Sequence, residues 1–187
     1  MSKRPKAQSV DKQGEADGFS PPMAYQPRVL DGGYTRIDVS VPPEKLSILH
    51  KAIISTCQAP FKLRYVRMID RQRGQLPKQE SWVVVELSQD RLQQICDHFN
   101  TLFYHDGRNQ IWIQGASGEQ LVLDELGMLY VYPDDFSFRE LLNTMGWVEA
   151  DHESMDTRDY VLVNLCAEAD QEERELFQSL GMVRWDG

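Results

Sequence analysis

The stretch from Ile111 to Tyr132, IWIQGASGEQLVLDELGMLYVY, decides how this chain folds. Its apolar runs are separated by two turn signals, Gly115 to Gly118 and Asp124 to Gly127. Short apolar runs with glycine-bearing turns between them are typical of antiparallel strands. The stretch therefore predicts a three-strand meander, and we expect a helix from Phe136 to Met145 to close it.

The residues before this stretch predict strand, helix, strand, strand and helix in turn. Thr35 to Val41 alternates apolar and polar side chains, as a half-buried strand does. Together with a strand over 111–114, this order is the βαββαβ arrangement of a ferredoxin-like sandwich. The predicted elements are a strand over 35–41, a helix from Pro43 that ends before Pro60, strands over 61–69 and 81–87, and a helix from Ser88 through Phe103.

A last strand over 160–167 and a last helix over 171–180 complete the expectation. The predicted fold class is α+β, with a ferredoxin-like part followed by an antiparallel meander with two C-terminal helices. Residues 1–33 are rich in Ser, Gln, Lys, Gly and Pro, which predicts a flexible tail. The ferredoxin-like part covers 34–110, and the acidic part covers 111–187. These two parts form either one continuous domain or two that abut near residue 110.

Residues 139–148 align without gaps on residues 174–183. An internal repeat is one interpretation of this similarity. The other is that both segments are amphipathic helices that end in glycine and continue into a strand. The sequence leaves both interpretations open.

The charges are sorted along the chain. Residues 111–187 carry 4 Lys+Arg against 17 Asp+Glu, a net of −13, whereas residues 34–110 carry 11 against 8, a net of +3. A one-signed surface speeds encounter with partners of the opposite charge. We therefore expect a non-enzymatic protein-binding module, either an adaptor or an immunity-type inhibitor, that presents an acidic C-terminal face to a basic partner.

Aromatic anchors inside a charged rim are how binding patches are built. The C-terminal part offers such anchors in two places, a tryptophan in the first strand of the meander and two tyrosines in the last. The predicted partner-binding residues are Trp112, Tyr130, Tyr132, Asp134, Asp135, Glu149 and Asp151.

A basic tract with interleaved aromatic residues is the alternative site, because a sheet with such side chains holds phosphates and stacks bases. Its predicted nucleic-acid residues are Lys62, Arg64, Tyr65, Arg67, Arg71 and Arg73. The strand period places Lys62 and Arg64 on one face but Tyr65 and Arg67 on the other, which weakens this hypothesis. An edge strand protected by charge against aggregation explains the same residues. The apolar run 82–85 predicts that the next strand is central.

Motifs for catalysis are missing from the sequence. It has no Gly-x-Ser-x-Gly elbow and no paired histidines at metal-ligand spacing, so we expect no cofactor and no metal. An enzyme with an unrecognised site near His98, His105 or an acidic cluster stays a further alternative. The three cysteines form no CxxC pair, which favours a reducing compartment, and we expect the cytoplasm and no membrane anchor. The sequence does not predict an oligomeric state.

Overall fold

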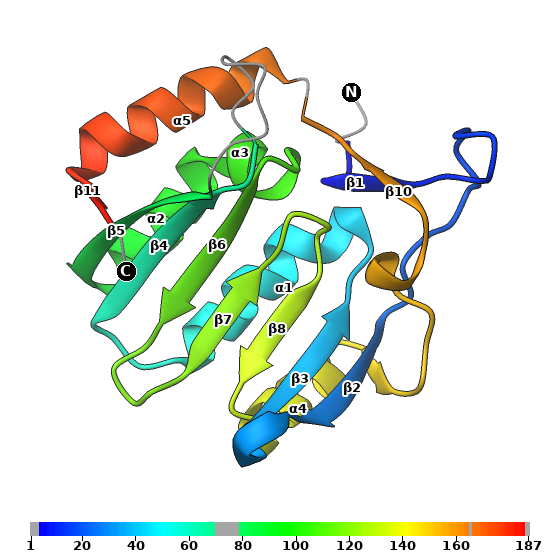
Figure 1. The fold of residues 1–187 in the computed structure, drawn as a ribbon. Coiled ribbons are helices and arrows are strands. Elements are labelled where there is room, and N and C mark those ends of the chain that lie inside the picture. The colour runs from blue at the N-terminus through cyan, green and yellow to red at the C-terminus, as the bar shows by residue number, and fades with distance from the viewer. Residues whose placement is uncertain (1–3, 70–78, 165, 186–187) are drawn as a thin grey trace.

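The computed structural model describes residues 4–69, 79–164 and 166–185, and Figure 1 shows their arrangement. The helices are α1 (Pro43–Thr56), α2 (Gln89–His98), α3 (Asn100–Tyr104), α4 (Phe136–Thr144) and α5 (Ala167–Leu180), with short 3-10 turns η1 (Asp31–Gly33) and η2 (Met155–Thr157). The strands are β1 (Ala7–Ser9), β2 (Ala24–Val29), β3 (Thr35–Ser40), β4 (Phe61–Arg67), β5 (Glu80–Leu87), β6 (Asn109–Gln114), β7 (Gln120–Leu123), β8 (Leu129–Tyr132), β9 (Val148–Glu149), β10 (Tyr160–Leu162) and β11 (Val183–Arg184).

One nine-stranded sheet forms the centre of the molecule, in the order β11-β5-β4-β6-β7-β8-β3-β2-β9. Its neighbours are antiparallel except for the pair β2 and β9. The strands β1 and β10 pair with each other in a separate two-stranded sheet. The predicted meander over 111–132 is confirmed as β6, β7 and β8, because each apolar run pairs with the next across a turn.

Helices cover one face of the large sheet (Figure 1). The apolar residues of each strand point to that side, because side chains alternate along a strand. On β4, β6 and β8, for example, Leu63, Ile113 and Val131 are buried in the main core, which also includes Leu49 and Ile53 of α1. The helix α5 packs against β4 and β5, because its Phe177 ring contacts the rings of Tyr65 and Trp82.

The structure has the α+β class that the sequence predicts, but it does not confirm the ferredoxin-like arrangement. The first strand of the predicted βαββαβ part, β3, pairs with β8 and β2, and β7 and β8 separate it from β6. Strands from both sides of residue 110 belong to the same sheet. The predicted central strand β5 lies instead beside the edge, because its outer neighbour is the two-residue strand β11.

The predicted tail over 1–33 needs correction where the structure describes it. Residues 7–9 and 24–29 are strands, and β2 belongs to the large sheet. Lys6, Ala7 and Tyr25 are each 1% exposed. The composition of residues 1–33 does not indicate a strand at 24–29. The reason is that β2 is stabilised by six paired positions along β3 rather than by large aliphatic side chains of its own.

Three predicted element boundaries also change. The helix predicted over 88–103 is two helices, because Phe99 leaves the helical conformation at φ −95°, ψ 36°. The predicted strand over 160–167 shortens to β10, and α5 begins at Ala167 rather than at residue 171. Residues 70–78, between β4 and β5 in the sequence, lie outside the described residues.

The two similar segments 139–148 and 174–183 each contain the end of a helix, a glycine with positive φ and a short strand. Gly146 has φ 92° and Gly181 has φ 58°, a conformation that glycine adopts at little cost. The strands that follow, β9 and β11, form the opposite edges of the large sheet. In both segments, a helix that ends in glycine is therefore followed by a short strand at an edge of the sheet.

Candidate functional site: the open face of the sheet

Among the described residues, no helix covers the second side of strands β4, β6, β7, β8, β3 and β2 (Figure 1). We call this side the open face. Its residues are those that alternate with the core positions of each strand. The open face comprises Lys62, Arg64, Trp112, Gln114, Gln120, Val122, Tyr130, Tyr132, Arg36, Asp38, Gln26 and Arg28.

Strand register places these residues in two rows that run across the sheet. The first row is Arg64, Trp112, Val122, Tyr130, Asp38 and Gln26. The second row is Lys62, Gln114, Gln120 and Tyr132, followed by Arg36 and Arg28. The second row has cations at both ends, with amide and aromatic side chains between them, whereas the first row begins at Arg64 and ends at Asp38 and Gln26.

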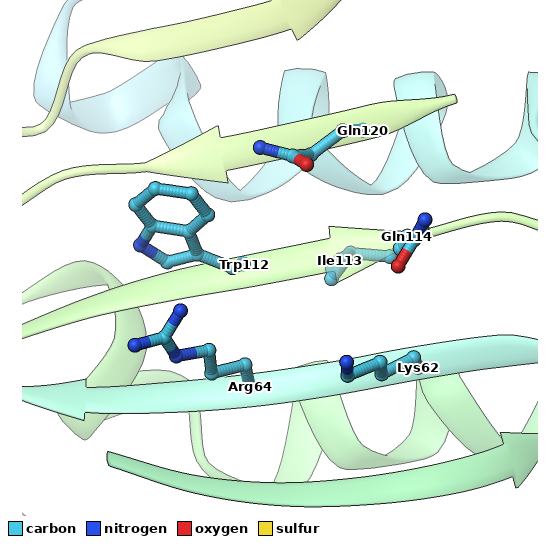
Figure 2. Close-up of a pocket in the computed structure, with 6 residues that line it drawn as sticks. All are labelled: Lys62, Arg64, Trp112, Ile113, Gln114 and Gln120. Carbon is cyan, nitrogen blue, oxygen red and sulfur yellow. The ribbon is translucent and has the colours of Figure 1, made fainter. Parts of the chain in front are cut away.

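At the β4 end, two cations lie against aromatic rings, and Figure 2 shows one of them, Arg64, beside Trp112. The Arg64 guanidinium carbon is 5.6 Å from the ring centroid of Trp112, and the Lys62 ammonium is 4.4 Å from that of Trp185. Within the described part of the chain, neither cation has a carboxylate partner, and the buried Arg64 Nε has no hydrogen-bond acceptor. A cation without a counter-ion is ready to bind an anion from solution.

A hollow of about 130 Å³ lies between these side chains. It is lined by Lys62, Arg64, Trp112, Ile113, Gln114 and Gln120 (Figure 2). Its volume is small compared with the pockets that enclose whole ligands, which hold roughly 300 to 1,000 Å³. The hollow therefore suits one group of a larger ligand, with cationic and amide donors around it.

At the β3 end, two arginines share one carboxylate. Arg36 Nε lies 2.5 Å from Asp38 Oδ1, and Arg28 Nε lies 3.6 Å from Asp38 Oδ2. Arg36 also lies 4.7 Å above the ring of Tyr130 and donates a 3.3 Å hydrogen bond to the Tyr132 hydroxyl. Two cations on one anion leave a net positive charge at this end of both rows.

The N-terminal segment covers a third row of the sheet. Ala7 packs with Met128 and Met155, and Phe19 packs against the same cluster. The Lys6 ammonium donates hydrogen bonds to Asn109 O at 2.9 Å and Oδ1 at 3.1 Å, and to Phe103 O at 3.1 Å. Exposed side chains of the open face are thus confined to a band two residues deep along each strand.

Burial changes the ionisation of two groups beneath this cover. It lowers the pKa of Lys6 to about 8, although Asp124, Asp106 and Glu125 oppose the change. Burial raises the pKa of Asp124 to about 7, and nearby Glu125 adds to the effect. Asp124 accepts hydrogen bonds from Met128 N and the Tyr130 hydroxyl, so it connects the covered row to the open face.

The structure divides the predicted nucleic-acid residues as the strand period indicates. Lys62 and Arg64 lie on the open face, whereas Tyr65 and Arg67 point to the helices and contact Glu173 of α5. Arg71 and Arg73 lie outside the described residues. The edge-strand interpretation is wrong, because β4 pairs with β5 on one side and β6 on the other.

The predicted partner-binding residues also separate into two groups. Trp112, Tyr130 and Tyr132 lie on the open face, each beside an arginine, and the Tyr130 hydroxyl also donates a hydrogen bond to Asp124. The acidic residues lie around α4: Asp134 and Glu149 both pair with Arg139, Asp135 caps the helix by accepting from Ser137 N, and Asp151 is exposed.

Sequence reasoning missed Arg28, Arg36, Gln114 and Gln120 as parts of a site. The alternation of 35–41 does place Arg36 and Asp38 on the polar side of their strand. That signal identified a half-buried strand but not its neighbours. Only strand register brings Arg36 and Tyr132 together, from positions 96 residues apart.

The other candidate groups serve structural contacts. His98 Nε2 lies 2.7 Å from Glu175, and His105 Nδ1 lies 2.8 Å from Arg4 O. Burial raises the pKa of Cys57 and of Cys96 to about 12, which makes both thiols poor nucleophiles. In the described residues, no three His, Cys, Asp or Glu side chains gather as a metal site would require.

No family model, curated protein or solved structure matches this chain. None of the described helices has the length and apolar character needed to cross a bilayer.

Proposed function

We propose that the protein is a binding module that takes single-stranded nucleic acid on its open face. The observation that carries this proposal is the pair of cations without carboxylate partners, Lys62 and Arg64, beside Trp112. Open antiparallel sheets with basic and aromatic side chains bind single strands by holding phosphates while bases stack on the rings.

An interior position for β4 supports the proposal. Charged side chains are expected on edge strands, where they prevent strand pairing with other chains. Since β4 has a neighbour on each side, that role does not account for its outward cations. The amides of Gln114 and Gln120 line the same hollow and offer both hydrogen-bond donors and acceptors to a base.

The net charge of −9 opposes binding to polyanions, so binding depends on the electrostatic potential at the open face itself. Many acids of the C-terminal part are already paired within the fold. Asp170 lies 2.5 Å from Arg108, and Glu173 lies 3.0 Å from Arg67. Unpaired positive charge therefore remains on the open face of an acidic molecule, and it acts at distances shorter than about 8 Å in physiological salt.

A salt titration of oligonucleotide binding tests the proposal. For the unmodified protein, the affinity for a labelled single strand should fall as salt rises, because phosphate contacts release counterions. Replacing both cations (Lys62→Gln with Arg64→Gln) should reduce the slope of log K against log salt by about 1.4, at about 0.7 for each lost contact. A matched control (Lys45→Gln with Arg91→Gln) removes the same charge from the helical layer and should leave the slope unchanged.

Two results would count against nucleic acid. If both double variants lose the same affinity, net charge rather than the open face determines binding. If polyglutamate competes as well as the oligonucleotide does, the site takes an acidic polypeptide, because bases that stack on Trp112 add about 1 to 3 kcal/mol each.

A second candidate is the protein-binding function that the charge distribution predicts. The observation that favours it is Phe136, which is 77% exposed at the start of α4. The ring borders a hollow of about 350 Å³ that is also lined by Arg139, Glu140 and Glu149. An exposed aromatic side chain with acids around it fits a basic protein partner.

Charge neutralisation near α4 tests this second candidate. The suitable variant is Glu149→Gln with Asp151→Asn, because Asp134 and Asp135 hold the start of α4 in place. We expect a tagged variant to retain less of a basic protein partner than the wild type does at low salt. Equal recovery of the partner would refute the use of these acids.

A further inference from the structure

The open face has cations at two places separated by most of the sheet. Lys62 and Arg64 lie on β4, whereas Arg36 and Arg28 lie on β3 and β2. From β4 to β3 the path crosses β6, β7 and β8. At about 4.8 Å for each step between strands, Arg36 on β3 lies roughly 19 Å from the β4 cations and Arg28 on β2 lies roughly 24 Å from them.

Aromatic side chains occupy the path between these ends. Trp112 is one strand from β4, and Tyr130 and Tyr132 are one strand from β3. Tyr130 already carries Arg36 over its ring, so Tyr132 is the tyrosine that offers a base its ring face. The order along the second row is therefore cation, amides, ring and cation.

The shape of the uncovered band sets the direction of a ligand. Along the strands the band is only two residues deep, because Asp124, Met128 and Ser40 of the next row are buried. Two positions on the same side of a strand are about 7 Å apart. The band is thus longer across the sheet than along the strands.

We propose, on the basis of the function proposed above, that a single strand crosses the sheet at right angles to the β-strands. Lys62 and Arg64 hold its backbone at one end, and Arg28 holds it at the other. One base stacks on Trp112 and another on Tyr132. A strand that reaches both ends has about four nucleotides or more, the lower limit of site sizes in modules of this kind.

Substitution of Arg28 distinguishes a ligand that crosses the whole sheet from one that binds only at Lys62 and Arg64. Its side chain is 51% exposed, so the Arg28→Gln variant removes a charge without opening the core. Asp38 keeps its bidentate partner Arg36 in that variant. The matched control is Arg91→Gln, which removes the same charge from an exposed position on α2.

The experiment measures the affinity for labelled oligothymidylates of about two to about eight nucleotides at low salt. We expect the affinity of the unmodified protein to rise up to about four nucleotides and then to level. The Arg28→Gln variant should bind the longer oligonucleotides about fivefold more weakly, and dinucleotides as the wild type does. The Arg91→Gln variant should match the wild type at every length.

Two results overturn the path. One is an unchanged affinity of Arg28→Gln for the longest oligonucleotide, and the other is an equal loss at every length. In both cases, if Lys62→Gln with Arg64→Gln still reduces the salt dependence, the proposed function stands without the path. If the unmodified protein binds no oligonucleotide of any length, the proposed function itself is refuted.

Discussion

Lys6 is a buried amine, and its removal should change how stability depends on pH. Its side chain is 1% exposed, and burial lowers its pKa from 10.5 to about 8. Asp124, Asp106 and Glu125 raise the pKa, but burial outweighs them. Between pH 8 and 10.5 the unfolded chain therefore binds more protons at this site than the folded chain does.

This difference in bound protons determines whether the free energy of unfolding rises or falls with pH. Stability rises with pH wherever the unfolded state binds more protons. As pH rises from 8 to 10.5, Lys6 should thus increase the free energy of unfolding. At about 1.36 kcal/mol for each pH unit between the two pKa values, the increase is about 3 kcal/mol. The Lys6→Met variant lacks the titrating group and should not show this gain.

Urea denaturation followed by tryptophan fluorescence measures the effect, at a pH of about 7 and again at about 10.5. The quantity to compare is the free energy of unfolding of the wild type minus that of Lys6→Met. It should be larger at the higher pH by about 3 kcal/mol. Lys45→Met changes an exposed lysine of α1 and should give a difference that does not vary with pH. A constant difference for Lys6→Met as well would refute the buried-amine interpretation.

Three further substitutions test the cover and its buried charges. Gly107→Ala should cost about 1 to 3 kcal/mol and speed proteolysis of the N-terminal segment, because the new Cβ would lie 2.3 Å from Lys6 O. In Asp124→Asn, stability should fall less than in the wild type as pH rises from 4 to 7, since the raised pKa of Asp124 makes the folded state bind more protons in that window. Arg108→Gln should cost about 3 to 5 kcal/mol in chemical denaturation, because it leaves Asp106, which is 0% exposed, without its 2.8 Å partner.

Local patterns in the sequence predicted the elements that depend on local chemistry. The turns at 115–118 and 124–127 fix the meander, because glycine permits the tight connections that antiparallel neighbours require. The apolar stripe of α1 predicted its buried side, including Leu49 and Ile53. Both signals lie within about a dozen residues of the structure they specify.

Elements that depend on distant partners escaped prediction. Strand β2 contains Pro27 and few large aliphatic residues, so its own sequence does not indicate a strand. It forms because β3 offers six paired positions on one side and β9 adds two more on the other. The burial of Lys6 was not predicted for the same reason. A lysine is expected to be exposed, and only the fold shows its hydrogen-bond acceptors at residues 103 and 109.

The candidate site shows the same division between local and distant information. The strand period correctly separated Lys62 and Arg64 from Tyr65 and Arg67. It did not supply Trp112, which register places opposite Arg64 from 48 positions further along the chain. As a result, the cations and the aromatic residues of one surface were assigned to two different hypotheses.

The uneven charge distribution along the chain has an explanation inside the fold. Acids of α5 lie against cations from the first part of the chain, with Asp170 on Arg108 and Glu173 on Arg67. Some acids of the acid-rich segment therefore form ion pairs with the base-rich segment inside the fold. Opposite charges that are separated in sequence stabilise contact between distant segments, so segregation along a chain does not by itself predict a charged surface. Lys62 and Arg64 are the stronger functional signal, because among the described residues no carboxylate pairs with either of them and both lie against aromatic rings on the open face.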